Sequence, residues 1–118
     1  MKKIFNNIIP FKGYIAINLF GILFVRNEYK TLLSKKVINH ENIHTKQMKE
    51  LLYIIFYIWY LIEYIIKLIL CITKKDRFSI AYYSISFEQE AKFNENNLEY
   101  LNSRKRYNWF KYIFKLWK

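Results

Sequence analysis

The stretch NHENIHTKQ, residues 39–47, contains both histidines of the chain, four residues apart, with a glutamate directly after the first. On a helix, residues i and i+4 share one face, so His40 and His44 can present two imidazole nitrogens to one metal ion. Glu41, about 100° around the helix, can reach a water molecule on the open position of that ion. This H-E-x-x-H arrangement predicts a helix at residues 35–50 that holds one zinc ion, with Glu41 as the general base. The alternative is a pair of surface histidines on an amphipathic helix.

The composition indicates a small folded protein with an anionic partner. The chain has 118 residues, of which 53% are hydrophobic, and only two glycines and one proline, which argues against disorder and against a turn-rich all-β fold. We therefore expect one mainly helical α+β domain over residues 1–118. The formal net charge of +11 favours an anionic membrane, an acidic substrate or nucleic acid as partner. The single cysteine, Cys71, excludes an internal disulfide.

Five segments follow from the pattern of apolar, turn and capping residues. They are a β-hairpin at 14–26 with a tight turn at Phe20-Gly21, the motif helix at 35–50 with Ser34 as N-cap, an apolar helix at 51–72, a helix at 86–101 with a capping box of Ser86 and Gln89, and a basic amphipathic tail at 104–118. The first residues begin like a signal peptide, but Asn6, Asn7 and Pro10 interrupt the apolar run and no cleavage site follows, so we expect mature sequence.

A catalytic zinc ion needs a third protein ligand. The chain has no third histidine, and its one aspartate, Asp76, lies in a lysine-rich loop, so the ligand must be a glutamate. Glu50 and Glu63 follow His44 on the same or the next helix and cannot easily fold back onto the metal. The remaining candidates are Glu88, Glu90, Glu95 and Glu99.

Glu88 is the preferred candidate. It lies in the first turn of its helix, and Ala91, one turn later, is small enough for close packing against the motif helix. Glu88, Ala91 and Glu95 form one stripe, whereas Glu90 points about 200° away from Glu88. The alternative interpretation is an ordinary acidic helix start, favoured by the helix dipole.

The combination of His40-Glu41-x-x-His44 with Phe87-Glu88-x-x-Ala91 resembles the HExxH…ExxA signature of minimal gluzincin metallopeptidases. These include integral-membrane prenyl-protein and heat-shock proteases and the antirepressor peptidases of antibiotic sensing. The chain is more similar still to short uncharacterised bacterial proteins with a hairpin, HExIHxxQ and FExEA, over roughly residues 10–110. The resemblance implies His40, His44 and Glu88 as zinc ligands and Glu41 as the base. Many members carry aspartate after the alanine; this chain has Lys92, so a carboxylate that orients a ligand histidine is absent or supplied by Glu95.

The resemblance also implies a substrate strand, and the chemistry of peptide hydrolysis requires an oxyanion donor. In zincin-like peptidases an edge strand beside the motif helix holds the substrate backbone, and Ile22, Phe24 and Arg26 are the expected residues of that strand. A hairpin that only covers the core is the alternative. Tyr82 and Tyr83, shortly before Glu88, are candidates for stabilising the oxyanion.

The apolar segment 51–72 has the length of a transmembrane helix, but such a span conflicts with Glu88 as a ligand. Across a bilayer, residues 73–87 would have to return through hydrocarbon, which the basic loop before residue 78 disfavours. We expect instead a buried helix, or one partly sunk in the membrane surface, with residues 77–87 returning in extended form. The pair Glu63 and Lys67 is interpreted as structural. The expected location is cytoplasmic or peripheral on the cytoplasmic membrane face, with a transmembrane span as the alternative.

The tail combines lysines with aromatic residues at helical spacing. Lys111, Phe114, Lys115 and Trp117 are expected to bind an anionic membrane surface. Packing of the aromatic face on the domain is the rival interpretation, and no nucleic-acid-binding motif is present.

The sequence therefore predicts a zinc-dependent hydrolase that acts on a peptide bond. The alternative is a non-catalytic, basic, membrane-associated protein with a structural or degenerate metal site.

Overall fold

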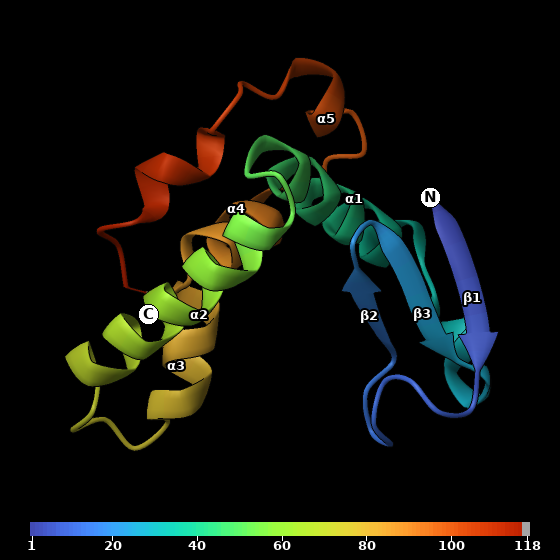
Figure 1. The fold of residues 1–118 in the computed structure, drawn as a ribbon, viewed down its shortest axis with the longest axis horizontal. Helices are drawn as coiled ribbons and strands as arrows, with labels where there is room; N and C mark the ends of the chain where they lie inside the picture. The colour runs from blue at the N-terminus through green and yellow to red at the C-terminus, as the bar shows by residue number, and fades with distance from the viewer. Residues whose placement is uncertain (117–118) are drawn as a thin grey trace.

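The computed structural model describes residues 1–116 and has the predicted mainly helical α+β fold (Figure 1). The N-terminal part comprises β1 (Lys2–Asn6), β2 (Ala16–Leu19), β3 (Ile22–Arg26) and the 3-10 helix η1 (Asn27–Leu32). The rest comprises α1 (Lys35–Glu50), α2 (Ile54–Leu70), α3 (Arg77–Ser84), α4 (Ser86–Asn94), α5 (Tyr100–Ser103) and the 3-10 helix η2 (Asn108–Tyr112). The motif helix α1 lies between the sheet and the pair α2 and α3 (Figure 1).

The predicted hairpin is confirmed, with a first strand that begins two residues later than expected. β2 and β3 pair antiparallel, and the turn residues Phe20 and Gly21 have φ of 54° and 88°. Two successive positive φ values match a tight turn whose twist suits the flanking strands. A side chain at Gly21 would place its Cβ 3.4 Å from the Thr45 methyl group, so the turn lies directly on α1.

The sheet contains a strand that the sequence did not predict. β1 pairs parallel with β3, so the strand order is β1-β3-β2 and β3 is central. The expectation that Ile22, Phe24 and Arg26 form an open edge strand is therefore wrong, because their strand is paired on both sides. The edge strand beside α1 is β2, where the Asn18 amide donates to the Glu41 backbone carbonyl (2.9 Å) and to Thr45 Oγ1 (3.0 Å).

The apolar segment is shorter than predicted and sharply bent away from α1. α2 begins at Ile54 because residues 51–53 break the helix, with φ of 54° at Leu52 and 61° at Tyr53. The axes of α1 and α2 differ by 109°. Within residues 1–116, no single helix combines the length and apolar character that crossing a membrane requires; only the bent pair α1 and α2 does so, by length and composition taken together.

The predicted extended return of residues 77–87 is wrong, because most of this segment is the helix α3. The distance to be covered is short. The Glu63 carboxylate accepts hydrogen bonds from the Ser86 amide and hydroxyl, both at 2.6 Å, so the chain returns only to the level of Glu63 and not along all of α2. From Glu63 to the end of α2 a helix rises about 10 Å, and the eight residues of α3 cover about 12 Å.

The same contact corrects the predicted capping box. Ser86 is the first residue of α4 and not its N-cap, because both of its polar groups bind Glu63. The Gln89 amide donates instead to the Ser84 and Lys115 carbonyls, at 2.7 and 2.9 Å. α4 ends at Asn94, so residues 86–101 do not form one helix.

The predicted amphipathic helix at 104–118 is wrong over the described part of the tail, which contains only η2. Trp109 and Tyr112 are buried, and Ile113 packs partly against the core, whereas Phe114 is almost fully exposed. Trp117 lies outside the described residues. The hydrophobic core that the tail completes consists of Met48, Phe56, Ile85, Phe87 and Trp109.

Candidate metal centre

The motif residues lie on a helix whose position is fixed at its start. The Ser34 hydroxyl accepts a hydrogen bond from the Val37 amide (3.3 Å), as predicted for the N-cap. One turn later, the buried Asn39 side chain donates to the backbone carbonyls of Glu95 (2.8 Å) and Asn97 (3.0 Å), just beyond α4. These bonds hold the motif helix against α4, the helix that carries Glu88.

Three potential metal-ligand atoms meet at this contact. His40 Nε2 and His44 Nε2 are 3.1 Å apart, and Glu88 Oε1 lies 3.4 Å from the first and 3.2 Å from the second. Ligands of a tetrahedral zinc ion with bonds of about 2.0 Å are separated by about 3.3 Å. The predicted convergence of His40, His44 and Glu88 is therefore observed, and the three side chains form a group that could hold a metal ion.

The contact on the far side of the His44 ring determines which nitrogen carries a hydrogen. His44 Nδ1 lies 2.8 Å from Gln47 Oε1. The Gln47 amide nitrogen already donates to the Phe87 carbonyl (3.0 Å) and to Glu90 Oε1 (2.9 Å). Gln47 Oε1 must therefore accept from His44 Nδ1–H, and in neutral His44 the Nε2 atom carries a lone pair.

His40 is oriented in the same way by a carboxylate. Its Nδ1 atom lies 2.7 Å from Glu95 Oε2, so Nδ1 donates and Nε2 again carries a lone pair. Glu95 thus occupies the orienting role that the sequence left open. Lys92 pairs with Glu95 at 3.1 Å. Many members of the family that this chain resembles have aspartate at the position of Lys92. With both imidazoles neutral, three electron pairs, on two nitrogens and one carboxylate oxygen, converge on one point, which only a positive charge can stabilise.

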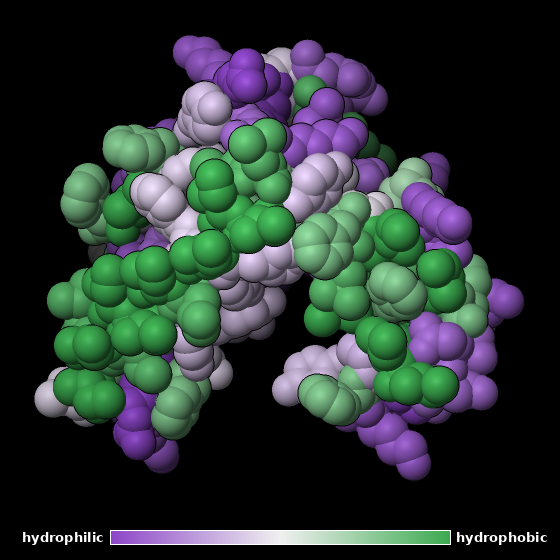
Figure 2. All heavy atoms as spheres, in the orientation of Figure 1, coloured by the Kyte–Doolittle hydropathy of each residue, from purple (hydrophilic) through white to green (hydrophobic). Residues whose placement is uncertain are grey.

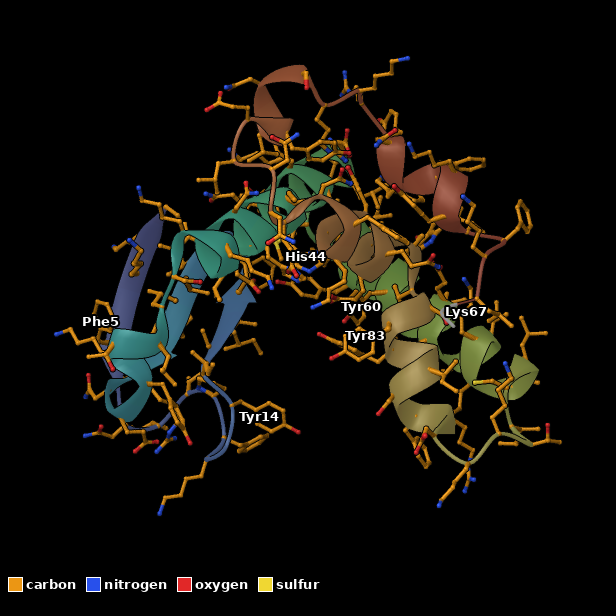
Figure 3. The ribbon with its side chains drawn as sticks, turned by 180° about the vertical axis from the view of Figure 1, so that it is seen from behind. Phe5, Tyr14, His44, Tyr60, Lys67 and Tyr83 are labelled. Carbon is orange, nitrogen blue, oxygen red and sulfur yellow. The ribbon has the colours of Figure 1, made fainter. Side chains whose placement is uncertain are left out.

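Sequence reasoning missed Tyr60, which contacts the third ligand. The Tyr60 hydroxyl donates to Glu88 Oε2 at 2.7 Å, so only Oε1 faces the histidines. Tyr60 and His44 lie near each other at the centre of the molecule (Figure 3). With eleven tyrosines in the chain and a bend before α2, the sequence carried no signal that distinguishes Tyr60.

The pKa values of the buried groups reflect this arrangement. Burial opposes ionisation of Glu88, but in the metal-free chain the nearby charge of His44 and the contacts of the carboxylate with both imidazoles hold its pKa well below the usual range. Burial alone would lower the pKa of His44, but the charge and hydrogen bond of Glu88 raise it to about 9 when no metal is bound. Burial raises the pKa of Glu41, with the two histidines acting in the opposite direction. Burial and the charge of Glu88 raise the pKa of Tyr60, so its hydroxyl stays protonated and donates.

Glu41 lies at the wall of a groove of about 400 Å³ between the sheet and the helices. Its lining includes His44, Glu88, Tyr60 and Tyr82 from the helices and the whole of β2. The groove therefore connects solvent with the metal-ligating group, the proposed base and the free edge of the sheet.

The other predicted site residues lie elsewhere. Arg26 is buried and donates to the Pro10 carbonyl (2.8 Å) and to Glu28, so it stabilises the N-terminal loop. Tyr82 lines the groove, as an oxyanion donor requires, whereas Tyr83 is not among its lining residues. The tail residues Lys111, Phe114 and Lys115 do not contribute to this groove.

The acidic residues excluded as ligands have other partners. Glu90 and Glu50 both bind the buried Arg104 guanidinium, at 2.5 and 2.9 Å, and Glu63 binds Ser86.

Comparison of this chain with known protein families, with curated proteins and with solved structures finds no match.

Proposed function

We propose that this chain is a zinc-dependent hydrolase that cleaves peptide bonds. The observation that carries the proposal is the convergence of three lone-pair atoms within 3.1–3.4 Å, with the outer nitrogen of each imidazole held by an acceptor. Two histidines and one carboxylate leave a fourth position open, which is the donor set of catalytic rather than structural zinc. The groove beside the centre gives that position access to a substrate.

The chain supplies the groups that peptide hydrolysis needs. Zinc bound at this centre would polarise the scissile carbonyl and lower the pKa of a bound water to about 7. Glu41 accepts the proton of the attacking water at its carboxylate, and its raised pKa favours holding that proton until the leaving amine takes it. Tyr82, whose pKa burial and Glu88 raise, remains a hydrogen-bond donor on the groove wall.

The free edge of β2 is suited to hold the substrate backbone. The Ile15 carbonyl accepts from the Arg26 amide, so by alternation Ile15 and Ile17 pair with β3 while the backbone groups of Ala16 and Asn18 face outward. The Asn18 carbonyl indeed accepts from the Tyr57 hydroxyl, at 3.3 Å, and not from β3. A peptide in extended form can pair with the outward groups of Ala16 and cross the metal centre.

Metal analysis of the purified full chain tests the binding part of the proposal. We expect about one zinc ion per chain. Glu88→Gln keeps the size of the side chain but removes its charge, and should lower the zinc content to less than half. Glu99→Gln, an exposed residue on the other side of the Asn97 turn, is the matched control and should retain full zinc content. A zinc content that Glu88→Gln leaves unchanged would refute the centre.

Glu41→Gln tests the catalytic part. This variant should bind zinc as the unmodified protein does, but lose at least about a hundredfold in cleavage of a library of internally quenched peptides.

The second candidate function, a non-catalytic membrane-associated protein with a structural metal centre, is favoured by the exposed apolar face of α2. It predicts zinc in both proteins and no metal-dependent cleavage by either.

A further inference from the structure

The helix α2 has an inverted distribution of charged and apolar residues. Its two charged residues, Glu63 and Lys67, are only 5% and 3% exposed. Its aromatic residues also face inward, with Phe56 in the core and others packed around it. The isoleucines and leucines point outward, and those of α2 that are exposed are Ile54, Ile55, Ile58, Leu61, Ile62, Ile65, Ile66, Ile69 and Leu70. A helix in contact with water has the opposite arrangement.

Hydrogen bonds of the two inward charged side chains fix the orientation of α2. Glu63 accepts from Ser86 and from the Trp59 indole (3.1 Å). Lys67 donates to the Ser84 and Lys115 carbonyls, at 2.6 and 2.7 Å. Rotating α2 to hide its isoleucines would expose these bonds and leave the backbone of α4 without its cap. The apolar face is therefore a fixed surface of the molecule.

This surface is continuous with the tail. One side of this face and the tail residues Ile113 and Phe114 border a groove of about 490 Å³. Its lining from α2 includes the outward Ile55, Ile58, Ile62, Ile66 and Leu70 and the inward Glu63 and Lys67, and Lys115 is part of its lining from the tail. Figure 2 shows the continuous hydrophobic patch over α2 and a hydrophilic group at its lower end, where the chain turns into the loop before α3. That loop carries the exposed Lys74 and Lys75 with one exposed acidic residue, Asp76. A contiguous patch of exposed large apolar side chains is typical of an interaction site.

The charge distribution identifies the kind of partner. Most acidic residues are turned inward to the metal centre, to Arg104 or to Lys67, so that among residues 1–116 only Glu28, Asp76 and Glu99 are exposed. Most lysines and arginines are exposed. Cationic side chains at both the helix end and the tail, around an apolar face, match a surface with anionic headgroups above hydrocarbon.

We propose that the outward face of α2, together with Phe114, inserts into the surface of an anionic membrane, while Lys74, Lys75 and Lys115 contact the lipid headgroups. The helix lies along the interface, and its apolar side chains enter the acyl region. The proposal does not depend on hydrolysis or on zinc. It differs from the tail-based prediction in that α2 supplies most of the apolar contact.

Sedimentation of the full chain with vesicles tests this. We use phosphatidylcholine alone, and phosphatidylglycerol with phosphatidylcholine in a ratio of about one to three. Binding to the anionic vesicles should exceed binding to the neutral ones and should weaken with added salt. Ile62→Glu, at a residue 53% exposed, should weaken binding at least about tenfold. Its matched control is Leu98→Glu, at a residue 51% exposed outside α2, which should change binding less than about twofold.

A second pair of variants tests the headgroup contact. Replacing Lys74 and Lys75 by glutamine should weaken binding to anionic vesicles about thirtyfold, since each lysine near the surface contributes about 1 kcal/mol. The same replacement at Lys2 and Lys3, on β1, removes equal charge far from α2 and should change binding little. Retained circular dichroism shows that each variant is folded. Equal effects of the two lysine pairs would overturn the proposal and indicate attraction by bulk charge. If the chain does not bind vesicles but forms dimers that Ile62→Glu disrupts, the partner of α2 is a second copy of the chain.

Discussion

The neighbouring helices α1 and α2 both bury polar side chains, but those of α1 contribute to the candidate metal centre and those of α2 bind groups of the chain itself. In α1 the buried residues include Asn39, His44 and Gln47, while its lysines face solvent. In α2 the buried residues are Phe56, Glu63 and Lys67, while the aliphatic residues face outward. A helix that meets water on its outer face keeps lysines there, and a helix that meets lipid keeps isoleucines there.

The difference lies in how completely the buried groups are satisfied. Glu63 and Lys67 find donors and acceptors within the chain, so their cluster needs nothing from outside. His40, His44 and Glu88 point three potential ligand atoms at one another; a proton on His44 balances them without metal, and with both imidazoles neutral they need a cation between them. A buried polar cluster with an unmet charge indicates a binding site, and a balanced one indicates a structural role.

The largest effect is expected at the structural cluster. Glu63→Ala should destabilise the protein by about 3–5 kcal/mol, because it leaves Lys67 buried without its charge partner and removes the cap of α4. The adjacent Ile62→Gln should change the free energy of unfolding by less than about 0.5 kcal/mol, because this side chain faces outward. Urea unfolding of both variants measures the contrast, and equal effects would show that the orientation of α2 is wrong.

Zinc removal should have the next largest effect. At free zinc about a hundredfold above the dissociation constant, the metal stabilises the folded chain by about 2.7 kcal/mol. A chelator should therefore lower the thermal midpoint of the unmodified protein and leave that of Glu88→Gln unchanged. The comparison is made by differential scanning calorimetry. A chelator effect of the same size in both proteins would mean that zinc binds elsewhere.

A smaller effect is expected from the residues that orient the imidazoles. Glu95→Gln should weaken zinc binding about 10–100-fold, because the amide is a poorer acceptor for His40 Nδ1–H. Competition with a chromophoric chelator measures the affinity. Glu28→Gln, at an exposed acidic residue outside the centre, serves as the control. No change at Glu95 beyond that of the control would remove its orienting role.

The last expected effect is a pH dependence of the metal-free protein. The pKa of His44 is raised from 6.5 to about 9 in the folded chain, so the stabilisation from its pairing with Glu88 is complete below pH 6.5 and is lost as the pH rises through about 9. The lowered pKa of Glu88 makes its contribution complete above pH 4.5 and lost on acidification. Chelated protein should therefore show a decreasing urea midpoint between pH 6.5 and 9. A decrease that persists in Glu88→Gln would contradict this origin.

The sequence was most informative where rare residues carry the geometry. Ser34 and the spacing of His40 and His44 predicted α1, because a cap and an i, i+4 pair are local features. The scarcity of histidine and aspartate led to Glu88, and the helical stripe from Glu88 led to Glu95. Glu88 lies where that reasoning placed it, and Glu95 contacts His40, one of the two alternatives that the sequence left open.

Non-local contacts set the limits of the prediction. The parallel pairing of β1 with β3 involves no local turn signal, so the central position of β3 was not foreseen. The bend at Leu52 and Tyr53 contains neither glycine nor proline. It determines that Tyr60 meets Glu88 and that Glu63 meets Ser86. The β-branched and aromatic residues of α3 favour a strand locally, but packing against α2 makes the segment helical.

X-ray absorption at the zinc edge of the zinc-loaded protein reports the ligands of the metal centre directly. We expect one zinc ion with two imidazole nitrogens and only oxygen as its other ligands, at about 2.0 Å. Glu88→Gln should lose this spectrum, whereas Glu41→Gln should retain it. A sulfur ligand at about 2.3 Å from Cys71, or a site with fewer than two imidazoles, would contradict the centre formed by His40, His44 and Glu88.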